Sequence, residues 1–221
     1  MAAAAALGVL AGVCTGYVVQ AQRPPTPLPA LGQKSLEQAS GPAPNHRSSA
    51  GDRQARTEGD LRQLLVRKPN GATPLPWLPD TAQWLSLEDY ASQFDDAGSA
   101  LTEQTDAEFR RAAQIGWHQT GLGDVQIALV QYRQERTTAA AEFVDQASRE
   151  TTDSRPTGQA AVPGAHDGGA YVFGPGDSPS SSGYAVAWRG DVLLQIWVDG
   201  DDKKIPVKAL ADLAGRQWER L

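Results

Sequence analysis

Cysteine is nearly absent from this chain, and histidine is scarce. The 221 residues include one cysteine, Cys14, and three histidines, His46, His118 and His166. A single cysteine excludes an intramolecular disulfide, so the fold must depend on its apolar core. The histidines show no metal-ligand spacing with cysteine or aspartate, so we expect neither a metal site nor a cofactor.

Positive charge and catalytic motifs are also lacking. The net charge is −6 and the pI is about 5.1, which argues against binding nucleic-acid phosphates or anionic lipid surfaces. The loop Gly174–Gly183 is rich in glycine and serine but has no P-loop lysine and no base beside its serines. The acidic cluster Asp199–Asp202 lacks EF-hand spacing and precedes two lysines, so it is interpreted as a solvated turn. We therefore expect no catalytic residues.

The first 22 residues carry no charge, and 2–19 are almost all apolar or small. A run of about 17 to 20 such residues can span a bilayer as a helix or act as an export signal. Three interpretations stay open: a retained single-pass anchor, a signal cleaved after Ala21, and a lipoprotein signal at Cys14, whose lipobox spacing is broken by Val13. Three glycines lie at four-residue intervals: Gly8, Gly12 and Gly16. On a helix they would share one face and could let two membrane helices pair in a homodimer, although the composition of the segment alone explains them.

The apolar run has no basic residue before it, and the nearest ones, Arg23 and Lys34, follow it. Taken literally, the positive-inside rule would leave the domain in the cytoplasm. We interpret the pattern instead as a translation start that lies further upstream. The predicted location is the cell membrane, with the domain outside the cytoplasm, or secretion after cleavage near Ala21.

The remaining chain divides into a tether, a lead-in and a domain. Residues 23–57 are proline-rich and polar, and we expect a disordered tether. Residues 58–100 form a helical lead-in, with short helices at 60–67 and 87–94, the second capped by Ser86. Residues 101–221 form an α+β domain with the order strand, strand, helix, three strands, helix. Short connections predict a mainly antiparallel five-stranded sheet with both long helices on one face. The predicted strands are 109–118, 125–132, 170–173, 184–188 and 192–198, and the predicted helices are 137–149 and 206–221.

Aromatic residues provide the candidate binding site. Tyr184 and Trp188 alternate onto one face of a strand, and Trp197 occupies one face of the next strand. If helices cover one face of the sheet, rings on the other face would line a shallow apolar groove. The alternative is an ordinary aromatic core, since aromatic residues favour strands. The candidate ligand-binding residues are Trp117, Tyr132, Tyr171, Tyr184, Trp188 and Trp197.

The chain resembles single-pass or lipoprotein-like extracytoplasmic proteins of high-GC actinobacteria. Four features carry this resemblance: the apolar start, the RPPTPLP tether from Arg23, the DLRQLLV segment from Asp60 and the terminal QWERL from Gln217. In architecture the chain is also broadly similar to small extracellular sensor domains. The resemblance supports a membrane-tethered domain, and the aromatic residues together with the lack of a catalytic motif lead us to expect non-enzymatic binding or sensing. The expected partner is an envelope protein or a small apolar ligand. The alternative function is a hydrolase or other enzyme acting on cell-wall material, and a structural spacer is a third.

Overall fold

The computed structural model describes residues 59–133, 136, 138–174, 180–201 and 204–221. The predicted anchor at 2–19, its glycine face and the proline-rich tether lie outside these residues. Within the described part of the chain, no helix is both long enough and apolar enough to cross a membrane.

One antiparallel sheet of seven strands organises the described residues, in the order β1-β2-β3-β7-β6-β5-β4. The long strands β2 (Phe109–Gln119) and β3 (Gly123–Tyr132) form a hairpin, and β3 pairs with β7 (Val192–Asp199) at the centre. Beyond β7 lie β6 (Ser182–Arg189) and β5 (Gly168–Phe173). The prediction of five strands was wrong, because two short edge strands were missed: β1 (Gln83–Leu85) and β4 (Gly158–Ala161).

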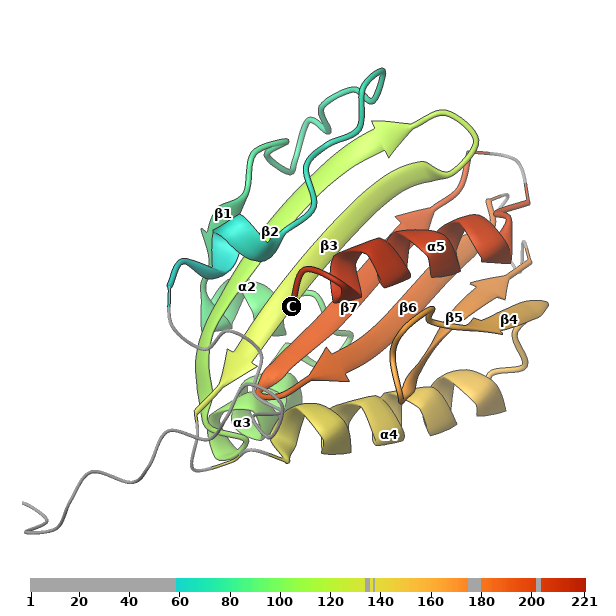
Figure 1. Cartoon of the computed structure of the whole chain (residues 1–221). Coiled ribbons are helices and arrows are strands. Elements are labelled where there is room, and N and C mark those ends of the chain that lie inside the picture. Colours follow the sequence, from blue (N-terminus) through green and yellow to red (C-terminus); the bar gives the residue numbers. More distant parts are fainter. Residues whose placement is uncertain (1–58, 134–135, 137, 175–179, 202–203) are drawn as a thin grey trace, which may run out of the picture. The chain divides into compact units, whose positions relative to one another are not determined.

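Helices cover both faces of the sheet, so the prediction that they share one face was wrong. The C-terminal helix α5 (Val207–Trp218) packs with Leu194, Ile196 and Val198 of β7, and Figure 1 shows it in front of the central strands. Helix α4 (Ala139–Asp153) belongs to a second buried cluster with Leu193 of β7. Successive residues of a strand point to opposite faces, so the two helices lie on opposite sides.

The lead-in also packs against both faces. The short 3-10 helix η1 (Leu61–Leu64) joins the α5 side through Leu61, whereas α2 (Leu87–Ala91) joins the α4 side through Tyr90. Ser86 caps α2 as expected, accepting a hydrogen bond from the Asp89 amide. A further helix, α3 (Ala97–Asp106), was not predicted; its N-cap is Asp96. Its buried side chains are only Ala100 and Gln104, so it lacks the broad apolar stripe that identifies a helix in a sequence.

Hydrogen bonds join the end of α5 to the segment at and just after η1. The side chain of Gln217 is fully buried; it accepts a hydrogen bond from the Val66 amide at 2.8 Å and donates one to the Leu64 carbonyl at 2.9 Å. Arg220 also donates to the Leu64 carbonyl, at 2.8 Å. These hydrogen bonds join residues about 150 positions apart in the sequence.

A buried carboxylate lies at the turn between β6 and β7. Asp191 is 1% exposed, and its Oδ2 accepts a hydrogen bond of 3.0 Å from Gln131 Nε2. The side-chain oxygen Oε1 of Gln131 accepts a hydrogen bond from Arg111. The other oxygen, Oδ1, is buried and has no hydrogen-bond partner among the described residues. Burial raises the pKa of this carboxyl group, and the hydrogen bond from Gln131 opposes that shift.

Gly123, where β3 begins, is required by its surroundings. Its φ is +102°, and an added Cβ would lie 2.1 Å from the Asp199 carbonyl oxygen. Gly121, in the same turn, has a φ of +83° but open space around it. The predicted hairpin is present, but its turn covers residues 120–122 and not 121–124, because Gly123 already pairs with Gln119 as the first residue of β3.

Candidate functional site

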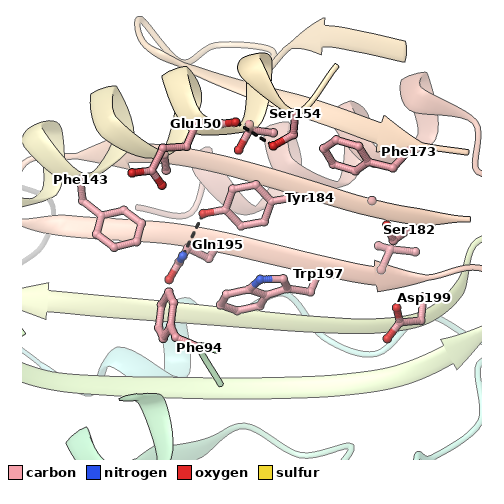
Figure 2. A pocket seen from close by; sticks show the side chains of 14 residues that line it. Phe94, Phe143, Glu150, Ser154, Phe173, Ser182, Tyr184, Gln195, Trp197 and Asp199 are labelled. Atoms are coloured by element: carbon pink, nitrogen blue, oxygen red, sulfur yellow. Dashed lines mark hydrogen bonds between the residues drawn. The ribbon is translucent and has the colours of Figure 1, made fainter. Parts of the chain in front are cut away.

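A hollow of about 440 Å³ opens on the face of the sheet that carries α4. Strands β6 and β7 form its floor, α4 forms one wall, and Phe94, shortly after α2, lies on the opposite side (Figure 2). Five aromatic rings line it: Phe94, Phe143, Phe173, Tyr184 and Trp197. All five are partly exposed. A ligand in the hollow would therefore meet aromatic surface that is still accessible to water.

A buried hydrogen-bond chain fixes the floor. Tyr90 donates from its hydroxyl to Gln195 Oε1 at 2.5 Å, and Gln195 Nε2 donates to the Tyr184 hydroxyl at 2.9 Å. Tyr90 and Gln195 are almost completely buried, so each depends on the other for its hydrogen bond. Burial raises the pKa of Tyr184, and the hydrogen bond from Gln195 only partly opposes this effect. Tyr184 is a neutral phenol at physiological pH, as a tyrosine with the ordinary pKa of about 10 would also be.

The ring positions follow from this framework. The Tyr184 and Trp197 centroids lie 6.0 Å apart with 42° between the ring planes, so the two rings form a tilted pair on neighbouring strands. Phe94 contacts the buried Tyr90 edge to face, with centroids 5.2 Å apart. Both arrangements are favourable for aromatic pairs. The sheet and α2 thus hold the two sides of the hollow in place.

The charged groups at the rim are carboxylates. Glu150 of α4 and Asp199 of β7 line the hollow, and its lining within the described residues includes no lysine, arginine or histidine. Glu150 accepts a 2.9 Å hydrogen bond from the neutral amide of Gln146. Asp199 lies next to Asp124 in the sheet register, and Asp124 Oδ1 is 2.7 Å from His118 Nδ1. The electrostatic potential of the hollow should accordingly be negative.

A second hollow, of about 540 Å³, lies along the other flank of α4. Tyr171 and Trp188 line it from β5 and β6. Its acidic lining residues are Glu142, Asp145 and Asp167. Asp145 is already 2.6 Å from Arg149, and the hollow contains fewer aromatic rings than the first.

The structure distributes the six sequence-predicted aromatic residues over three environments. Tyr184 and Trp197 line the first hollow, whereas Tyr171 and Trp188 line the second. Tyr132 is fully buried on this same face, where its hydroxyl donates to Gln104, and Trp117 is fully buried on the α5 face. These two residues belong to the core and touch neither hollow.

Three lining phenylalanines were missed as candidates. Phe143 was assigned to the apolar side of a helix, and Phe173 to the end of a strand, while Phe94 follows a helix of five residues. Their shared signal is proximity to the strand face that carries Tyr184 and Trp197. That signal is readable only once α4 and α2 are known to lie on that face.

The five partly exposed rings of the first hollow form an aromatic surface. Within the described residues, no group of three or more histidine, cysteine, aspartate or glutamate side chains is arranged to hold a metal ion. No protein-family model, no curated protein and no solved structure matches this chain.

Proposed function

We propose that this chain is a binding domain whose ligand occupies the aromatic hollow between α4 and the β6–β7 floor. The observation that carries the proposal is the set of five partly exposed rings held around one hollow by buried neighbours. Binding sites are typically concave and largely preformed, with aromatic walls and a few fixed polar groups. This hollow has those features.

The energetics suit a small ligand or a side chain of a partner protein. Burying about 150 Å² of apolar surface contributes roughly 4 kcal/mol at about 25 cal/mol per Å², before the cost of association is subtracted. Because the floor is already fixed by Tyr90 and Gln195, little further ordering is needed on binding. The hollow would thus favour weak and reversible binding, as in a sensory or accessory domain.

We further propose that residues 2–19 tether the domain to a membrane on its extracytoplasmic side. The support is the uncharged apolar segment and the proline-rich run after it. The alternative function, an enzyme acting on cell-wall material, differs in a measurable way. It predicts turnover of wall fragments that depends on Glu150 or Asp199, whereas a binding domain leaves the fragments unchanged.

The test is titration of the full chain with N-phenyl-1-naphthylamine, an uncharged apolar dye that fluoresces on entering an apolar site. We expect saturable binding that Trp197→Ala weakens and that Ala147→Trp blocks, because Ala147 lines the hollow. Trp77→Ala is the matched control, since Trp77 is 66% exposed and lies outside the hollow. Circular dichroism confirms that each variant folds. Unchanged dye binding in folded Trp197→Ala and Ala147→Trp would refute the proposal.

A further inference from the structure

We infer that the aromatic hollow selects a small organic cation with an apolar body, such as a quaternary ammonium or an alkylated amine. This inference rests on the proposed function and adds a ligand class to it. Two observations lead to it independently: the arrangement of the rings and the sign of the charged groups among them.

The rings supply the first argument. An aromatic face carries partial negative charge and attracts a cation, with tryptophan the strongest and tyrosine and phenylalanine next. Tyr184 and Trp197 form an adjacent tilted pair on the floor, and Phe143 lies near them on α4 (Figure 2). Tyr184 is neutral at physiological pH, since the ordinary pKa of tyrosine is about 10 and burial raises it further, so its contribution comes from the ring and the phenol dipole.

The carboxylates supply the second argument. Glu150 and Asp199 line the same hollow, and neither forms a salt bridge with a described residue. Helix α4 carries four acidic side chains and one basic side chain. The basic one, Arg149, is paired with Asp145 at 2.6 Å. An anionic ligand would therefore meet like charges without a described counter-charge, whereas a cation would gain both ring and carboxylate contacts.

The site should therefore bind apolar ligands of different charge with different affinities. A neutral ligand gains only from burial of its apolar surface. A cation of the same shape gains in addition from the rings, by an amount that corresponds to about a 2- to 30-fold difference in affinity. This difference is the quantity to measure.

Choline and 3,3-dimethyl-1-butanol form the matched pair, because the second has a carbon in place of the charged nitrogen. Each gives one strong methyl signal, so saturation-transfer NMR on the full chain yields both dissociation constants directly. We expect choline to bind about 2- to 30-fold more tightly. Glu150→Gln should reduce this ratio at least 2-fold, because it removes the carboxylate charge and keeps the side-chain shape. Glu142→Gln, on the other flank of α4, is the control and should leave the ratio unchanged.

The outcomes separate the two proposals. Equal binding of the pair, tighter binding of the alcohol, or equal effects of Glu150→Gln and Glu142→Gln would overturn the cation inference while leaving the binding site itself in place. Absence of binding by both compounds, with the naphthylamine dye still bound, would also overturn it and leave the proposed function standing. If the dye fails to bind as well, both proposals fall.

Discussion

The hydrogen-bond chain under the hollow makes a quantitative prediction for Gln195→Met, a substitution of similar volume without hydrogen-bonding groups. It removes the acceptor of the buried Tyr90 hydroxyl and the donor to Tyr184. A buried hydroxyl left without a partner costs about 1–3 kcal/mol, and the second hydrogen bond contributes about 0.5–1.5 kcal/mol. We expect the free energy of unfolding to fall by about 2–4 kcal/mol. For a domain of this size the melting temperature should drop by about 4–16 °C.

Tyr90→Phe tests whether the loss is due to an unpaired partner. Alone it leaves Gln195 Oε1 buried without its donor and should cost about 1–3 kcal/mol. Combined with Gln195→Met, it removes both members of the pair, so no buried group of that pair remains unsatisfied. The double variant should therefore be more stable than the sum of the two single losses predicts, by about 1–3 kcal/mol.

Urea denaturation followed by circular dichroism measures all four proteins of this cycle. Tyr184→Phe is a useful comparison, because water that reaches the partly exposed position of the lost hydroxyl can accept the hydrogen bond from Gln195 Nε2. It should cost less than Tyr90→Phe. Additive losses in the double variant, or a loss below about 0.5 kcal/mol for Gln195→Met, would refute the argument that this chain fixes the floor of the hollow.

Three further predictions concern stability. Gln217→Ala should lower the free energy of unfolding by about 2–4 kcal/mol, since it removes the buried hydrogen bonds of Gln217 to Val66 and Leu64. The exposed neighbour control Glu219→Ala should stay within about 0.5 kcal/mol in urea titrations. Asp191→Asn should stabilise the domain by about 1 kcal/mol at pH 7. Because the pKa of Asp191 is raised in the folded state, ionisation of this carboxyl group lowers the stability as pH rises above the unfolded-state pKa. The stability advantage of the asparagine variant should therefore shrink as pH falls toward 4. A stability difference that does not depend on pH would contradict this reasoning. Gly123→Ala should cost about 3 kcal/mol or more from strain and clash, against about 1 kcal/mol for Gly121→Ala, where space is open; equal losses in calorimetry would contradict the packing argument.

The sequence allowed the long elements to be predicted because their signals are local. Val125–Tyr132 has the β-branched and aromatic composition of a strand, and the structure extends that strand by two residues to Gly123. Pro206 was expected to open the last helix, and it is the N-cap of α5. In these segments propensity, turn residues and periodicity agree.

The arrangement of helices about the sheet was not predicted, although β7 carried the signal. From Val192 to Val198 it is apolar at every position except Gln195, whereas a strand with one solvated face alternates. The two apolar faces of β7 require cover on both sides, and α5 and α4 supply it. The exception, Gln195, is the residue that organises the floor of the hollow.

The edge strands and the phenylalanine walls depend on tertiary contacts. Strand β4, with the sequence GQAA, has neither β-branched nor aromatic residues and is a strand only because it pairs with β5. Phe94 and Phe143 come together with Trp197 through the packing of α2 and α4 on one face. Composition and periodicity do not encode such long-range placement. The sequence therefore allowed the strand residues of the aromatic groove to be predicted, but not the residues that form its walls.

The most direct test of the binding site uses the six tryptophans of the chain, since each gives one indole N–H signal in a ¹H–¹⁵N NMR spectrum. Titration of the full chain with the naphthylamine dye should shift the Trp197 signal, assigned through Trp197→Phe, in proportion to dye binding. Trp77 and Trp84 lie outside both hollows and should stay fixed. A dye that binds while Trp197 remains unshifted, or that shifts Trp77, Trp84 or Trp188 instead, would contradict the assignment of the hollow as the binding site.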